Sequence, residues 1–174
     1  LQNWIDNKSD LINSHKFSID FEYKVAIKEK NLTKDEYKKI EFYSINEDSS
    51  IFRIDNRITF CNPAYWITID LNSKQTFFLN VDNEFEKLKE QFLEIFKDNN
   101  YKIINYKKNK YLFSMDEYFV NMNINYEEGL EVLKKISIKD SKQKNIIKNF
   151  HIGLIDSIPY NYSDWDHLIK IDLR

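Results

Sequence analysis

Apolar and polar side chains alternate one by one between residues 17 and 27. The apolar positions are Phe17, Ile19, Phe21, Tyr23, Val25 and Ile27. Successive side chains of a β-strand point to opposite faces of a sheet, so this pattern predicts a long strand with one buried face and one solvated face. A helix would distribute the same residues around its whole circumference. The fold must therefore offer this strand a core on one side and solvent on the other.

Shorter alternating runs follow, separated by polar turn signals. They occupy 40–44, 52–54, 58–60, 65–71, 77–81, 101–106, 110–115, 118–126, 132–139 and 145–154. Asn and Asp tolerate the left-handed backbone of tight turns, and they recur between the runs, as at Asp55-Asn56. We expect about nine or ten strands, and strands that follow one another without intervening helices form antiparallel meanders.

Two stretches show helical spacing instead. Residues 3–13 predict a short N-terminal helix, and residues 84–98 carry one apolar stripe, which includes Phe92, and predict a second helix. Because a large antiparallel sheet curls or splits, we expect a curved sheet whose concave face is covered by these helices. After Pro159 an irregular, aromatic-rich tail is expected. No linker or repeat interrupts the chain, so residues 1–174 are interpreted as a single α+β domain.

Composition excludes several classes of function. The chain has 2 Gly, at positions 129 and 153, so no glycine-rich phosphate loop is present. The single cysteine, Cys61, excludes an intramolecular disulfide and a thiolate zinc cluster. Twenty-six basic against 28 acidic residues indicate no nucleic-acid-binding face. No apolar run approaches the ~20 residues that span a bilayer. The first residue is Leu1, which fits a cleaved leader or a trimmed chain.

The order of several short motifs resembles the LolA/LolB family of lipoprotein-localisation factors. The strand that opens with Phe17-Ser18-Ile19-Asp20-Phe21 is similar to the family's first strand, and Phe52-Arg53 matches its Phe-Arg pair. Residues 61–70 resemble the family's tryptophan-containing strand, and residues 128–140 resemble its Gly-Leu hairpin. The family's fold is an incomplete β-barrel with helices as a lid, so the resemblance implies that the curved sheet forms such a barrel.

The resemblance also implies a function and a set of site residues. The expected protein is a non-enzymatic carrier of the bacterial envelope that holds a lipid or the acyl chains of a lipoprotein in an apolar half-barrel. Arg53 matches the family's arginine that hydrogen-bonds the lid. The other expected ligand-binding residues are apolar or aromatic: Phe17, Ile19, Phe21, Tyr23, Trp66, Ile67, Ile69 and Phe92. Each is also open to a plain structural role, as a core residue or, for Arg53, as an exposed strand residue.

Other sites and partners are weighed in the same way. Asp164, Asp166 and His167 are the one compact cluster of metal-type ligands, but no second histidine is near them, so no metal and no cofactor are expected. The expected partners are a lipid or acylated lipoprotein and envelope proteins, with no nucleic acid, and the chain is expected to be a monomer. A periplasmic or outer-membrane location is expected if a leader preceded Leu1, and a cytoplasmic one otherwise. The alternative is a protein-binding module with a filled core, such as a toxin-neutralising immunity protein.

Overall fold

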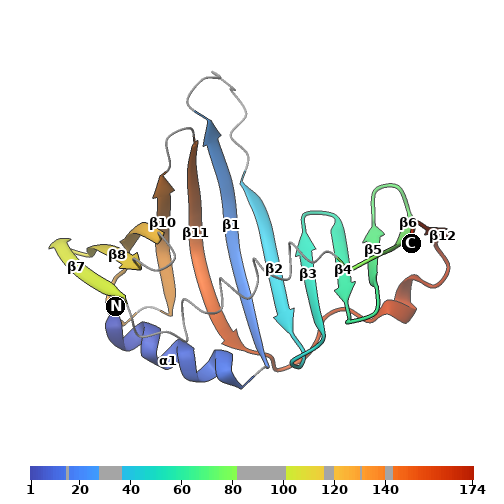
Figure 1. Ribbon diagram of the computed structural model, residues 1–174, viewed down its shortest axis with the longest axis horizontal. Helices are drawn as coiled ribbons and strands as arrows, with labels where there is room; N and C mark the ends of the chain where they lie inside the picture. The colour runs from blue at the N-terminus through green and yellow to red at the C-terminus, as the bar shows by residue number, and fades with distance from the viewer. Residues whose placement is uncertain (15, 28–36, 82–100, 116–119, 130, 140–142) are drawn as a thin grey trace.

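One twisted sheet runs the whole length of the molecule (Figure 1). The computed structural model describes residues 1–14, 16–27, 37–81, 101–115, 120–129, 131–139 and 143–174. The elements of the described residues are α1 (Gln2–Asn13), β1 (Phe17–Ile27), β2 (Lys38–Ser44), β3 (Ser50–Ile54), β4 (Arg57–Cys61), β5 (Trp66–Asp70), β6 (Gln75–Leu79), β7 (Lys102–Lys107), β8 (Lys110–Met115), β9 (Val120–Asn125), β10 (Val132–Lys139), β11 (Gln143–Leu154), η1 (Tyr162–Trp165, a 3₁₀ helix) and β12 (Ile169–Asp172).

The sheet has 12 strands in the order β12-β6-β5-β4-β3-β2-β1-β11-β10-β9-β8-β7. It consists of two antiparallel meanders, β1 to β6 and β7 to β11, which join where β1 pairs antiparallel with β11. The last strand, β12, returns to pair parallel with β6 at one end. Strand β1 carries the predicted alternation and occupies the predicted residues 17–27, and α1 confirms the helix predicted over 3–13.

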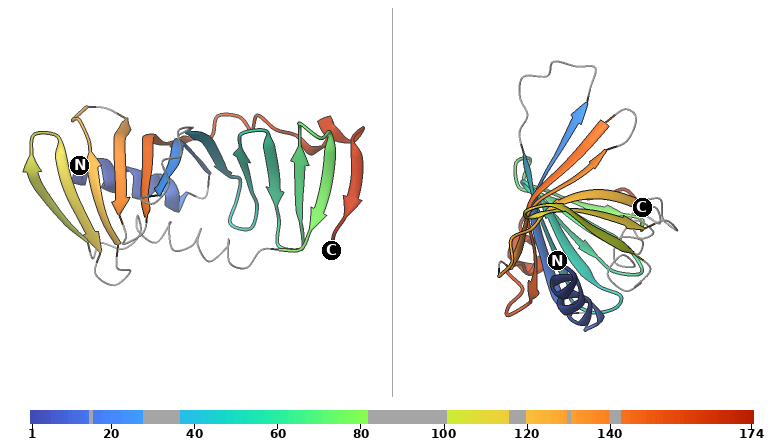
Figure 2. Two further views of the ribbon diagram at one scale, coloured as in Figure 1. Left: turned by 90° about the horizontal axis from the view of Figure 1, so that it is seen from above. Right: turned by 90° about the vertical axis from the view of Figure 1, so that its left-hand side faces the viewer.

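The predicted fold class, a curved sheet that forms an incomplete β-barrel with helices over its concave face, is wrong. The edge strands β7 and β12 lie at opposite ends of the long axis, so the sheet is open (Figure 1). Seen along its length, the sheet twists progressively (Figure 2), as consecutive strands do when their right-handed twist accumulates. In the described residues α1 is the one α-helix, and it packs against one half of the sheet. The second predicted helix, 84–98, lies outside the described residues.

Helix α1 covers the half of the sheet that holds β8 to β11 and β1. Its residues Trp4, Ile5 and Ile12 are buried together with apolar side chains of these strands. The buried strand residues are Phe17, Ile19, Phe113, Ile124, Leu133, Ile136, Phe150 and Ile152. The Trp4 ring lies 6.3 Å from the Phe150 ring, and its indole N–H donates to the Glu131 carbonyl at 3.2 Å. The main core therefore lies between α1 and one face of the sheet.

The C-terminal segment covers the other half on the opposite face. After β11 the chain crosses β2 to β5 and brings the Trp165 ring to 6.1 Å from Phe60 and the Tyr160 ring to 5.8 Å from Tyr43. Ile51, Ile58 and Ile69 are buried in this half. The two halves of the sheet are thus covered on opposite faces by these described segments.

Candidate functional site

The strand register defines the two faces of the sheet on either side of the candidate site. Phe42 lies opposite Ile19 on β1 and opposite Phe52 on β3, so these side chains share the face that α1 packs on, which we call the α1 face. Glu41 and Arg53 lie opposite each other on the other face. That face is crossed by the C-terminal segment, and we call it the tail face.

A groove of about 730 Å³ opens on the α1 face over β3 to β6. Three rows of cross-strand neighbours cross its floor. The apolar row contains Trp66 and Leu79, which lie opposite each other on β5 and β6. The middle row contains Thr59 and Thr68, whose hydroxyl oxygens are 2.9 Å apart. The third row contains the charged residues described below together with Ile54, so one end of the groove is apolar and the other end carries most of its polar groups.

The apolar end of the groove is formed by large side chains. The Phe52 ring packs edge-on against Trp66, with ring centres 6.1 Å apart. Trp66 is buried, and Phe52 and Leu79 are half-buried. Cys61 lies opposite Trp66 on β4 and is buried as well. An apolar chain that lay on this surface would lose its contact with water at a gain of about 0.8 kcal/mol per CH₂ group.

The polar end of the groove carries both signs of charge. Arg57 Nε donates to Asp70 Oδ2 at 3.0 Å across β4 and β5. The backbone N–H of Ser73 lowers the pKa of Asp70, and Arg57 and the backbone N–H of Asn72 lower it further. Asp70 is therefore ionised at neutral pH. Exposed Lys38 on β2 also lines the groove.

The predicted residues of β1 lie next to α1 rather than in the groove. Phe17 and Ile19 are buried in the core under α1. Phe21 is half-buried, with its ring 5.8 Å from that of Phe150. Tyr23 donates a hydrogen bond to Asn145 Oδ1 at 3.1 Å, and burial raises the pKa of its hydroxyl. Of the predicted aromatic ligand contacts in the described residues, Trp66 lies in the groove.

Arg53 lies on the tail face and hydrogen-bonds the C-terminal segment. Its Nη1 donates to Tyr160 Oη at 2.9 Å, and its Nε donates to the Asp55 carbonyl at 2.8 Å. Tyr160 in turn donates to Glu41 Oε2 at 2.6 Å, and Lys39 Nζ lies 2.6 Å from Glu41 Oε1. Arg53 therefore fastens the tail, whereas the sequence predicted that it fastens a helical lid. We call Glu41, Arg53 and Tyr160 the tail latch.

The remaining predicted residues divide between the tail face and the undescribed part of the chain. Ile67 and Ile69 flank Thr68 on β5, so they point to the tail face, where both are buried. Phe92 lies outside the described residues. The sequence analysis missed the groove residues Arg57, Thr59, Thr68 and Asp70. The sequence feature that could have indicated these residues is the alternation within β4 and β5. Arg57, Thr59, Thr68 and Asp70 alternate there with large apolar residues.

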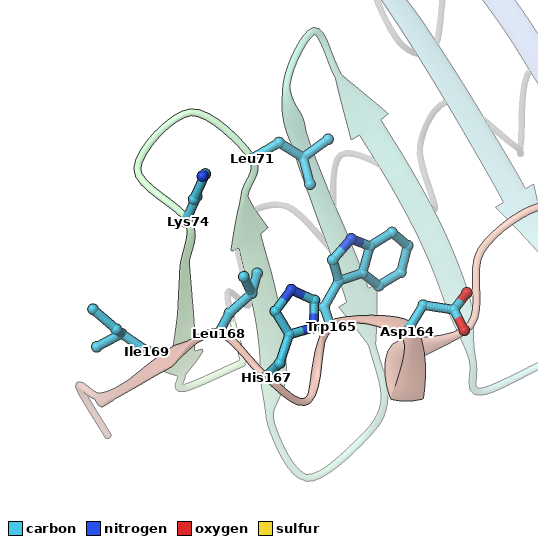
Figure 3. A pocket seen from close by; sticks show the side chains of 7 residues that line it. All are labelled: Leu71, Lys74, Asp164, Trp165, His167, Leu168 and Ile169. Atoms are coloured by element: carbon cyan, nitrogen blue, oxygen red, sulfur yellow. The ribbon is translucent and has the colours of Figure 1, made fainter.

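A second cavity, of about 520 Å³, lies beside η1 at the β5–β6 turn (Figure 3). Trp165, His167 and Leu168 form its wall, and Leu71 and Lys74 of the turn face them. The Asp164 carboxylate points away from the His167 ring (Figure 3). In the described part of the chain, no group of three or more His, Cys, Asp and Glu side chains is placed to hold a metal ion. No helix among the described residues is long and apolar enough to cross a membrane.

Comparison with solved structures gives a distant likeness of fold. No family model and no curated protein matches the chain. Among solved structures, the chain is similar to a LolA superfamily protein from Nitrosomonas europaea, with 11% sequence identity. The likeness covers 88% of this chain and 93% of that chain, with a TM-score of 0.43. This likeness concerns the fold alone.

Proposed function

We propose that the protein is a non-enzymatic carrier that binds an amphipathic, acyl-chain ligand in the groove over β3 to β6. The observation that carries the proposal is the polarity of the groove, which changes from Trp66 and Leu79 at one end to Lys38, Arg57 and Asp70, beside Ile54, at the other. A fatty acyl chain has the same division between an apolar tail and a polar head. Its tail would lie on the Trp66 end and its head at the Arg57 end.

The size of the groove supports a ligand of this class. Its volume of about 730 Å³ lies within the range of roughly 300–1,000 Å³ of small-molecule sites. The threonine pair in the middle offers hydroxyl groups to a glycerol or ester oxygen, while the apolar end offers none. A lipid or the acyl chain of a lipoprotein is the proposed cargo, and the bacterial envelope is the proposed location.

The proposal is tested by uptake of a fluorescent fatty acid by the full chain. We expect the emission of the probe to rise on binding because the Trp66 end of the groove excludes water. Thr68→Phe fills the middle of the groove and should reduce the affinity at least about tenfold. Thermal unfolding of this variant, compared with that of the wild type, shows whether the fold is retained.

Two adjacent lysines provide a matched pair of variants for the same assay. Lys38 lines the groove, whereas Lys39 lies on the tail face beside Glu41. Lys38→Gln should weaken binding of the anionic probe, and Lys39→Gln should leave it unchanged, although both remove one positive charge. Absence of any uptake, or an equal effect of the two variants, would contradict the proposal. A protein-binding module with a filled core would then be the better interpretation.

A further inference from the structure

Strand β12 forms an open edge of the sheet. In the part of the chain that the structure describes, β12 pairs with β6 on one side and ends the sheet on the other. Ile169 and Leu173, at the two ends of this edge, are 65% and 57% exposed. An edge with exposed apolar side chains is a template for pairing with another strand.

The backbone of β12 shows which groups are available for such pairing. The N–H of Leu173 donates to the Phe78 carbonyl of β6 at 2.9 Å. Because alternate residues of a strand direct their N–H and C=O groups to opposite sides, Ile169 and Ile171 also face β6. Lys170 and Asp172 therefore direct their N–H and C=O groups away from the sheet, toward a neighbour.

The sequence of β12 is complementary to itself about Ile171. Residues 169–173 read Ile-Lys-Ile-Asp-Leu. In an antiparallel pair of two such strands centred on Ile171, each Lys170 lies opposite an Asp172, and each Ile169 lies opposite a Leu173. Opposite charges and apolar pairs at facing positions both stabilise antiparallel strands.

We propose that two copies of this chain associate through β12, with Ile171 opposite Ile171 of the partner subunit. In this register Lys170 opposes Asp172 of the partner subunit, and both direct their backbone groups toward each other. Facing residues of this kind exchange two hydrogen bonds in an antiparallel ladder, and the two-fold symmetry repeats the exchange. The proposed assembly is a two-fold symmetric dimer with one continuous sheet. It differs from the monomer that was expected from the sequence.

The opposite edge of the sheet lacks this complementarity. Strand β7 carries Lys102 and Lys107 at its ends and no acidic residue. Antiparallel pairing of two β7 strands over their full length would place these lysines opposite each other. A register shift between Asn105 and Lys107 also makes this edge irregular, and lysines and bulges are known to protect edges from pairing. Within the chain Lys170 lies 3.2 Å from Asp166 and Asp172 lies 2.6 Å from Arg174, and exposed pairs of this kind are weak enough to exchange partners. The facing charges therefore favour β12 over β7 as the dimer edge.

The dimer would place the two grooves on the same side of the joined sheet. Facing residues of an antiparallel pair lie on one face, and Ile169 and Ile171 lie on the α1 face with Gln75 and Phe77. The inference does not rest on the proposed function, because it uses neither the groove residues nor a ligand. A dimer that binds no fatty acid would contradict the proposed function alone. A monomer that binds a fatty acid would contradict the dimer alone.

Sedimentation of the full chain tests the dimer. The interface is small, so we expect a dissociation constant between about 1 µM and 1 mM, with a mass that rises toward twice the 21.2 kDa of one chain. Asp172→Lys and Lys170→Asp each place like charges opposite each other at two positions. Each should weaken association at least about tenfold. Circular dichroism establishes that the variants remain folded.

Charge reversal supplies the matched controls. The double variant Lys170→Asp/Asp172→Lys restores complementarity and should dimerise like the wild type. An equimolar mixture of the two single variants should form a heterodimer for the same reason, while Lys102→Glu on β7 should change nothing. A wild type that stays monomeric up to about 1 mM, single variants that dimerise unchanged, or a double variant that fails to dimerise would each overturn the proposal.

Discussion

The fold lowers the pKa of the buried carboxyl of Glu41. Burial raises the pKa of this carboxyl, but the hydrogen bonds from Lys39 and Tyr160 outweigh burial and hold the pKa below its ordinary value of 4.5. The neighbouring Tyr43 shows the opposite effect, because burial and then the negative charge of Glu41 raise its pKa to about 12. The buried Glu41 carboxylate thus accepts hydrogen bonds from Lys39 and Tyr160 and raises the pKa of Tyr43 beneath the tail.

The stability of the protein should depend on pH through Glu41. A carboxyl whose pKa is lower in the folded state stabilises the fold above its unfolded pKa, and this stabilisation is lost as the pH falls through the folded pKa. Glu41→Gln should cost about 1–3 kcal/mol at pH 7, and the difference from the wild type should shrink below pH 4.5. Urea unfolding of both proteins between neutral and acidic pH measures it. A difference that stays constant with pH would show that the Glu41 charge contributes nothing.

At the level of elements, the spacing of apolar residues along the sequence correctly predicted the longer elements, whose periods are visible in the sequence. The alternation of 17–27 predicted β1, and the spacing within 3–13 predicted α1. Asp55 adopts the left-handed backbone (φ 52°) expected at its turn. The tail was predicted to be irregular, because η1 and β12 are too short to show a period. The aromatic residues Tyr160, Tyr162 and Trp165 of the tail were the available signal, since aromatic side chains gain by covering a sheet.

The tail latch should hold the C-terminal segment against the tail face. Tyr160→Phe removes the hydroxyl that donates to Glu41 and accepts from Arg53. We expect a loss of about 1–3 kcal/mol in the free energy of unfolding, because both partners are partly buried and lose a charge-assisted hydrogen bond. Chemical denaturation measures this loss. Tyr65→Phe removes the same atom from a side chain whose ring packs on Phe78, so an equal loss in this control would argue against the latch.

At the level of the whole molecule, the sequence could not fix the face on which each half is covered. Strand period tells which side chains share a face, as it does for Thr68 between Ile67 and Ile69. It does not tell which of two half-apolar faces a distant segment will cover. Trp66 was predicted as an apolar residue of a strand and lines the groove, whereas Arg53, for which the resemblance implied a hydrogen bond to a helical lid, lies on the tail face and bonds Tyr160.

The central claim is that an acyl chain binds on the α1 face over β3 to β6, and the three tryptophans of the chain test it directly. Trp66 lines the groove, Trp4 of α1 packs on Phe150, and Trp165 lies on the tail face against Phe60. Titration of ¹⁵N-labelled protein with a medium-chain fatty acid should shift the indole N–H signal of Trp66 and leave those of Trp4 and Trp165 in place. Shifts confined to Trp165 or Trp4, or no shift of Trp66 at saturating ligand, would contradict the account.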